Sequence, residues 1–290
     1  MKKTLIATAI AGAMSFSVAA QAAPVVYGNI QVAVDLENDL TAGDNGSTFG
    51  VKGENAMEGG LTSFYKIEAD VNAAAAKSAD SSATGDDANA FMVGDQAYMG
   101  VKGDFGQVLV GSKDTLINDF VQDVVYTPEA LKGAHTGVSG ASEVAQLQYT
   151  GDFDGVKVGA SVQLDGDEQA MQFVAALPVG AMTVSAGFDS VEGDIAAAVS
   201  LPVDALTVGA KLEMTEADDM IIAASASMDY SNGNVYGIVS MSDAKDQTNV
   251  AFGATYSVAS NMYVYGEFGS GDADLKENLA GTYVGAALVF

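Results

Sequence analysis

The stretch that decides the fold is Val156-Lys157-Val158-Gly159-Ala160-Ser161-Val162-Gln163-Leu164. Apolar residues occupy every second position, and lysine, glycine, serine and glutamine lie between them. Strict alternation over nine residues predicts a β-strand with one apolar and one polar face. The pattern recurs in residues 182–188, 206–214 and 26–34, so the chain is expected to be all-β.

The length and the charges of these segments favour a membrane barrel over a soluble β-sandwich, which also alternates. The segments approach the ~9–11 residues of a tilted transmembrane strand, whereas soluble strands average ~5–6. Charged residues also occupy positions of the interior type, which suits a polar lumen inside a lipid-facing wall. These residues are Lys66, Glu68, Asp70, Lys157, Lys211 and Glu213.

Sixteen antiparallel strands are predicted. They lie near 25–36, 46–53, 61–72, 90–102, 106–112, 143–151, 155–165, 168–177, 180–189, 193–202, 205–215, 219–230, 233–242, 248–257, 261–269 and 279–290. Tight turns are expected at 152–154, 178–179, 202–204, 231–234 and 258–260, and Asn232-Gly233 favours a type I′ turn. Longer or acidic connectors alternate with these turns, as in a barrel with short periplasmic turns and longer outer loops. Fourteen or eighteen strands are alternatives, because residues 90–102, 168–177 and 233–242 alternate less clearly.

The first residues have the pattern of an export signal. Lys2 and Lys3 precede an uncharged apolar run, and Ala20-Gln21-Ala22 fits a cleavage site. We therefore expect residues 1–22 to be a cleaved secretory signal peptide and residues 23–290 to form the barrel domain.

The charge balance of the chain excludes nucleic acid as a partner. Twelve basic residues, all lysine, oppose 38 acidic residues, which gives a formal net charge of −26. Such a field repels nucleic acid and attracts cations. The chain has no cysteine, yet 49% of it is hydrophobic, which argues against disorder. A closed barrel needs no disulfide, because neighbouring strands pair every backbone group.

The long connector 113–142 is the main functional candidate. Loops of this length in compact domains are generally functional or disordered. Its apolar residues suit a loop that folds against the wall inside the lumen, where its carboxylates would form a pore constriction and select ion sign. An external loop with a solvated acidic face is the alternative. The constriction candidates are Asp114, Asp119, Asp123 and Glu129.

Aromatic residues gather beside the tight turns, as in the interfacial girdle of a membrane barrel. They are Phe105, Tyr149, Phe153, Tyr230, Tyr256 and Tyr263, and Phe290 would anchor the closing strand. Inward-facing aromatics would instead indicate a sugar-holding ladder, but the candidates Tyr27, Phe64, Tyr236, Tyr263 and Tyr265 are scattered.

Several motifs, in order along the chain, resemble the general diffusion porins of Gram-negative bacteria. The motifs are Val26-Tyr27-Gly28, Phe49-Gly50-Val51-Lys52-Gly53-Glu54, the run from Ala97 to Gly106, and the run from Val110 to Thr115. The resemblance implies a homotrimer of sixteen-stranded barrels in the outer membrane. It also implies that the third outer loop, 113–142, narrows each pore and that the second, 73–89, reaches a neighbour.

The chain departs from this family on the wall opposite the third loop. Family members usually place arginines there, whereas this chain has Thr48, Asp95 and Ser112. A more negative lumen and a stronger cation preference are therefore expected. The predicted pore-wall charges are Lys52, Lys66, Glu68, Asp70, Asp95 and Lys113.

No catalytic, cofactor or metal site is predicted. The only histidine, His135, has no neighbouring nucleophile or second ligand in the sequence. Acidic clusters near residues 80–87, 165–168, 216–219 and 272–274 lack the pattern of a calcium loop, and solvated loops are the favoured interpretation. The predicted function is passive diffusion of small hydrophilic solutes and cations. A solute-selective channel and a closed barrel that serves as adhesin or scaffold are the alternatives.

Overall fold

The computed structural model describes residues 18–21, 23–37, 40–73, 92–132, 143–164, 169–191, 193–215, 219–243, 246–271 and 281–290. Its strands are β1 (Val18–Gln21), β2 (Val25–Asp35), β3 (Thr41–Asp44), β4 (Ser47–Met57), β5 (Thr62–Val71), β6 (Met92–Gly103), β7 (Gly106–Asp114), β8 (Glu143–Phe153), β9 (Val156–Gln163), β10 (Met171–Val179), β11 (Met182–Asp189), β12 (Ile195–Val203), β13 (Leu206–Met214), β14 (Met220–Tyr230), β15 (Gly233–Ser242), β16 (Gln247–Ala259), β17 (Met262–Ser270) and β18 (Gly281–Val289). Three short helices are η1 (Glu58–Gly60), α2 (Leu116–Phe120) and η2 (Gln122–Val124). No helix in these ranges is long and apolar enough to cross a membrane.

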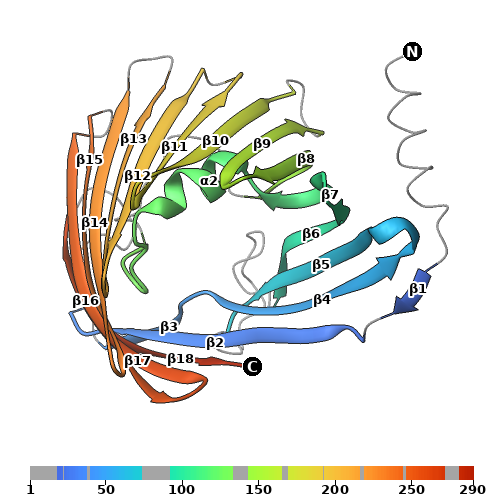
Figure 1. Cartoon of the computed structure of the whole chain (residues 1–290). Coiled ribbons are helices and arrows are strands. Elements are labelled where there is room, and N and C mark those ends of the chain that lie inside the picture. The colour runs from blue at the N-terminus through green and yellow to red at the C-terminus, as the bar shows by residue number, and fades with distance from the viewer. Residues whose placement is uncertain are drawn as a thin grey trace, which may run out of the picture.

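The strands form a closed antiparallel barrel with sixteen positions around the ring, which confirms the predicted architecture (Figure 1). β3 and β4 share one position, because β2 pairs with β3 over its second half and with β4 over its first. β1, inside the expected leader, pairs with the end of β4. The ring closes where β18 pairs with β2. Phe290 extends that pairing, because its backbone N–H and carbonyl both bond to Gly28 at 3.0 and 3.1 Å.

The two faces of the wall follow the alternation in the sequence. In β10, Phe173 and Leu177 are exposed on the outside, whereas Gln172 and Val174 are buried on the inside. In β13, Leu212 is exposed outward and Lys211 and Glu213 point inward. The exposed apolar outer faces of β10 and β13 suit contact with lipid.

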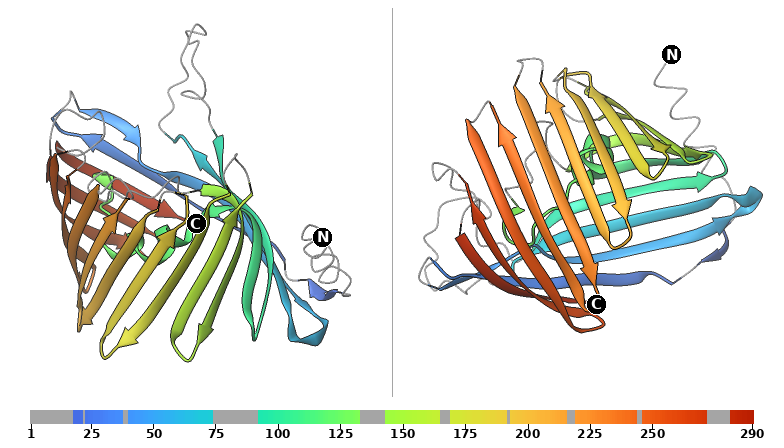
Figure 2. Two further views of the ribbon diagram at one scale, coloured as in Figure 1. Left: turned by 90° about the horizontal axis from the view of Figure 1, so that it is seen from above. Right: turned by 60° about the vertical axis from the view of Figure 1, so that its left-hand side comes forward.

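The tight turns lie together at one end of the barrel, and the strand ends that lead into the long connections lie at the opposite end (Figure 2). Asp154 and Gly155 form the turn between β8 and β9, both with positive φ, as a type I′ turn requires. The prediction of a turn at 178–179 is wrong, because both residues lie in β10, and the expected turn at 202–204 lies partly in β12. The actual two-residue turns are 180–181 and 204–205.

The prediction for Asn232-Gly233 is wrong. The turn consists of Ser231 and Asn232, since Tyr230 pairs with Gly233, and neither Asn232 nor Gly233 has positive φ. Gly233 is needed for a different reason: a Cβ atom there would clash with the carbonyl oxygen of Thr255. The glycine therefore permits close strand approach instead of turn geometry.

The outer face near the turns carries exposed aromatic residues, as predicted for an interfacial girdle. Phe105, Phe153, Tyr230 and Tyr256 are all exposed. Tyr263 does not belong to this group, because its hydroxyl donates to Glu129 at 3.0 Å inside the barrel. The ring of Phe290 packs on Gly28, where an added Cβ atom would lie 2.9 Å from the ring. The terminal aromatic therefore occupies the space that a side chain at Gly28 would take, at the point where β18 meets β2.

Candidate functional site

The segment that follows β7 lies inside the ring of strands, where α2 and η2 line one side of the lumen (Figure 1). The strand β7 extends to Asp114, so the connector begins at Thr115, two residues later than predicted. The side chain of Thr115 caps α2 by accepting a hydrogen bond from the N–H of Asn118 at 3.3 Å. This cap fixes where the chain leaves the wall.

One face of this inner segment is apolar and rests on the wall. Leu116, Ile117 and Val121 are fully buried and form one cluster with Val174 and two alanines of β12. Glycines on the wall make room: a Cβ atom at Gly159 would lie 3.0 Å from Leu116. Burial of three such side chains stabilises the inward position by about 1.5–3 kcal/mol each.

The opposite face of the segment carries Asp119 and Asp123, which are both exposed to the lumen. The carboxylate of Asp119 lies 2.5 Å from Nζ of Lys113 on the wall. Although Asp123 reaches the lumen, the surrounding protein removes part of its hydration and raises its pKa, and the negative charge of Asp119 adds to the rise. Two of the four predicted constriction carboxylates thus face the lumen.

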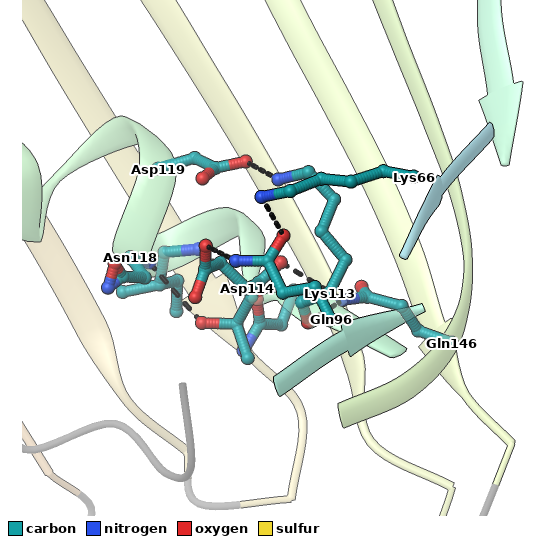
Figure 3. A network of polar contacts seen from close by, with 10 residues as sticks. Lys66, Gln96, Lys113, Asp114, Asn118, Asp119 and Gln146 are labelled. Atoms are coloured by element: carbon teal, nitrogen blue, oxygen red, sulfur yellow. Dashed lines mark hydrogen bonds and ion pairs between the residues drawn. The ribbon is translucent and has the colours of Figure 1, made fainter. Parts of the chain in front are cut away.

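Asp114 belongs to a polar network on the wall (Figure 3). Gln96 lies at its centre: its Nε2 donates to Asp114 at 2.8 Å, and its Oε1 accepts from Nζ of Lys66 at 3.2 Å. Gln146 donates to the backbone carbonyls of Lys113 and Asp114 at 2.7 and 3.0 Å. The network positions Lys66 and Lys113 side by side across from α2.

A β-bulge explains why strand β6 alternates poorly. Asp95 and Gln96 together lie opposite the single residue Glu68, because Ile67 pairs with Ala97 and Ala69 with Gly94. The extra residue changes which side chains face inward and breaks the two-residue period. It also brings Gln96 into the network described above.

The other predicted pore-wall charges lie on the neighbouring strands. Lys66 forms an ion pair with Glu68 at 2.7 Å. Lys52, directly across from Lys66 in the register, lies over the ring of Tyr27 at 4.7 Å. Asp70 pairs across strands with Thr48, closer to the long-loop end. The wall therefore has carboxylates beside its lysines and no uniformly basic face within the described residues.

The structure places Glu129 differently from the prediction, at a point where the loop is fastened to the wall. Its carboxylate accepts hydrogen bonds from Gln31 at 2.9 Å and from the hydroxyl of Tyr263 at 3.0 Å. Burial raises the pKa of Glu129, although these two hydrogen bonds oppose the rise and the nearby charge of Glu267 adds to it. This carboxylate is only partly exposed and serves as an anchor.

Glu267 in β17 is the centre of that attachment. Its carboxylate accepts the N–H groups of Glu129, Ala130 and Leu131 at 2.5, 2.8 and 2.9 Å, and the hydroxyl of Tyr236 at 2.5 Å. Hydrogen bonds to an ionised acceptor are worth roughly 1.5–3 kcal/mol each. The sequence prediction missed Glu267, although it follows Tyr263 and Tyr265 at inward positions.

Tyr126 strengthens the attachment on a second strand. Its ring stacks on Tyr236 with 4.3 Å between centroids, and its hydroxyl accepts a hydrogen bond from Asn234 at 3.1 Å. Its backbone N–H donates to Ser225 at 2.8 Å. Burial raises the pKa of Tyr126 to about 12, so the hydroxyl stays protonated at neutral pH. These tyrosines hold the loop and form no ladder along the lumen.

Beneath η2, Lys211 and Glu213 form a fully buried ion pair at 2.9 Å. Gln122 donates to the same carboxylate at 3.0 Å, so the loop covers the pair and bonds to it. The alternation in the sequence correctly placed both charges on the inner face. The cover provided by Gln122 could not be read from it, because 91 residues separate the partners.

The remaining predicted clusters lie largely or wholly outside the described residues, as does His135. These are the second outer loop beyond Ala73 and the acidic clusters near 80–87, 165–168, 216–219 and 272–274. Asp219 is the one residue of these clusters that the structure describes. In the described part of the chain, no group of three His, Cys, Asp or Glu residues could hold a metal ion.

A closed barrel of sixteen strand positions, an inner loop and a charged lumen together define the class of the protein, and a family profile agrees with them. The profile described as Gram-negative porin matches residues 7–276. The chain belongs to the Gram-negative porin family. A porin of this family with this barrel is a protein of the outer membrane.

Two curated relatives come from Halomonas. The "Monosaccharide porin" of a Halomonas species and the "Major outer membrane protein" of Halomonas elongata are each 39% identical over 197 residues, which is 58% of this chain. The match covers 50% of each relative, so the chain spans about half the length of the curated relatives it matches.

Solved porins share the fold at low sequence identity. A mutant of the Rh. blastica porin has a TM-score of 0.73 at 17% identity, covering 92% of this chain and 100% of that one. OmpT of Vibrio cholerae, solved in a trimer form, has a TM-score of 0.68 at 17% identity over 92% and 99% of the two chains. The anion-selective porin from Comamonas acidovorans has a TM-score of 0.67 at 14% identity over 92% and 98%. The shared fold therefore does not determine ion sign.

Proposed function

We propose that this porin forms a water-filled channel for passive diffusion of small hydrophilic solutes and ions, and that the channel favours cations. The observation that carries the proposal is the lumen-facing pair Asp119 and Asp123 on the inner loop. Their segment is fixed to the wall on both sides, so the two carboxylates hold a constant position in the path of a solute. Fixed charged side chains are an established way for a pore to choose ion sign.

The lysines on the facing wall do not offset this charge. Lys113 is engaged by Asp119 at 2.5 Å and Lys66 by Glu68 at 2.7 Å, and Asp114 adds a further carboxylate beside them. Carboxylates therefore outnumber ammonium groups across the narrow part of the lumen. The formal charge of −26 for the chain acts in the same direction, since a negative field concentrates cations at the entrance.

Single-channel recording in a planar bilayer under a KCl gradient tests the proposal. The refolded wild type should give conductance steps with a reversal potential of the cation sign. The double variant Asp119→Asn/Asp123→Asn should move the reversal potential toward zero, whereas Asp204→Asn, which neutralises an exposed carboxylate in the tight turn between β12 and β13, should move it little. An anion-sign reversal potential in the wild type would overturn the cation preference. The absence of steps from folded protein would overturn the channel itself and favour an adhesin or scaffold.

The same proposal includes assembly and export. A homotrimer, as in the trimer form of OmpT, predicts conductance steps in multiples of three. Removal of residues 1–22 predicts an exported protein that begins at Ala23, which N-terminal sequencing would determine. It would also remove β1 and leave the end of β4 without that partner.

A solute-selective channel is the second candidate, because one relative is named a monosaccharide porin. Liposome swelling would separate the two functions. A diffusion channel should admit neutral sugars in order of size, whereas a selective channel should admit one solute faster than others of equal size.

A further inference from the structure

A cavity of about 530 Å³ lies on the turn side of the Lys113–Asp119 pair. Strands β5 to β9 form its wall near their tight turns, and the end of α2 forms its upper edge, where Phe120 and Asp119 line it. Small-molecule sites commonly have volumes of about 300–1,000 Å³. The cavity opens into the lumen, so a solute that passes the inner loop enters it directly.

The charges that border this cavity are balanced. Its three lysines each lie beside a carboxylate: the neighbours are Lys113 and Asp119 at 2.5 Å, Lys102 and Glu54 at 2.5 Å, and the cross-strand pair Lys157 and Asp152. A balanced set of donors and acceptors leaves little net attraction for an ion. The same groups can still bond to a neutral ligand whose polar groups both donate and accept, as hydroxyl groups do.

Two further features point to a ligand with an apolar face and hydroxyl groups. Phe120 contributes an aromatic ring to a lining that is otherwise mostly polar or glycine. Gln148, which also lines the cavity, is only 1% exposed, and its Nε2 has no hydrogen-bond partner among the described residues. An unpaired buried donor is unfavourable. A ligand oxygen reached by rotation of this amide would satisfy it.

We infer that this cavity is a subsite for a neutral polyhydroxylated solute of monosaccharide size, an inference that rests on the proposed channel function. The C–H face of the sugar ring lies on Phe120, and its hydroxyl groups bond to the Lys113–Asp119 pair and to Gln148. Solutes are thereby held briefly after they pass the inner loop, on the side of the tight turns.

Ion current through the open channel measures this binding. D-glucose should reduce the current and add noise in a saturable, concentration-dependent way, and gluconate, its carboxylate analogue, should bind more weakly. The variant Phe120→Ala should weaken the apparent affinity for glucose about tenfold, and Phe120→Tyr should restore most of it. Phe153→Ala, which removes an exposed outer-face ring at the same end, is the matched control and should behave as wild type. Comparison at equal glucose concentration cancels the effect of viscosity.

The outcomes separate this subsite from the channel function. Normal ion conductance with a glucose effect that is the same in Phe120→Ala and Phe153→Ala would overturn the subsite and leave the channel intact. Tighter binding of gluconate than of glucose would overturn the assignment to neutral ligands. If no ion conductance is seen, saturation-transfer NMR with glucose and the folded protein in detergent tests the subsite directly. A signal that Phe120→Ala abolishes supports it, and the absence of a signal overturns it.

Discussion

Replacement of Glu267 by alanine should detach the inner loop from the wall. The carboxylate accepts three consecutive backbone N–H groups, from Glu129, Ala130 and Leu131. Ala130 and Leu131 are 3% and 0% exposed, so water does not replace the lost acceptor while the loop stays in place. The hydroxyl of Tyr236 loses its acceptor as well.

The size of the effect follows from these unpaired groups. Each buried N–H left without an acceptor costs about 1–3 kcal/mol. Three of them, allowing for local relaxation, should reduce the free energy of loop detachment by about 3–6 kcal/mol. Since 1.4 kcal/mol corresponds to a factor of ten, the detached state should become more populated by about 10²–10⁴-fold. The backbone pairings of β17 with β16 and β18 do not involve the Glu267 side chain, so the barrel should remain folded.

Limited proteolysis at Lys132 reports on this opening. In the wild type, Nζ of Lys132 donates to the carbonyl oxygen of Asn45 at 3.0 Å, which holds the cleavage site against the wall. Trypsin should cut after Lys132 far faster in Glu267→Ala than in wild type, in proportion to the detached population. Glu54→Ala is the control, because it removes an exposed carboxylate that does not contact the loop. Equal cleavage rates in the two variants would refute the role given to Glu267.

Three further changes test other parts of the molecule. Burial raises the pKa of Asp123 and of Glu129 above the ordinary ~3.9 and ~4.3. Since Asp123 faces the lumen, the cation preference should begin to fall on acidification before ordinary carboxylates protonate, as measured by reversal potential against pH. The folded state binds these two protons more tightly than the unfolded state, so the two groups favour folding as the pH falls through that window. Lys211→Met should destabilise the barrel by about 3–5 kcal/mol in urea unfolding, because it leaves the buried carboxylate of Glu213 unpaired, whereas Lys211→Met/Glu213→Leu should recover most of the loss. Phe290→Ala should cost about 2 kcal/mol in the same assay, roughly half of a core Phe→Ala change, because the ring is 51% exposed.

The two-residue alternation predicted the inner and outer faces of most wall strands, because the direction of a side chain in a strand depends on its position in that strand alone. The faces of β9 and β13 follow directly from their sequences, including the inward placement of Lys211 and Glu213. Alternation was weak in β10 and β15 for a physical reason. Val174 and Ile238 face inward yet are apolar, because the inner loop packs against them and makes the inner face partly a hydrophobic core. A strand with apolar residues on both faces has no readable two-residue period.

The candidate site was harder to predict, because its contacts are not local. The sequence showed an acidic loop, and the structure places Asp119 and Asp123 of that loop in the lumen. Nothing in the sequence near Glu129 indicates that its backbone bonds to Glu267, 138 residues further along the chain. Likewise Gln96 could be assigned to the inner face only after the bulge opposite Glu68 was known.

The pairing of β18 with β2 has a consequence for how the protein assembles. Every other pairing in the ring joins strands that are neighbours in sequence, apart from the contact of β1 with β4 and the pairing of β2 with β4, which have only β3 between them. Each of those hairpins can form as soon as its own two strands exist, but a folding intermediate without the last contact has two open strand edges. Unpaired backbone groups in hydrocarbon cost several kcal/mol each. We therefore expect insertion into the bilayer and ring closure to occur together, or to require a helper that pairs with both edges until Phe290 reaches Gly28.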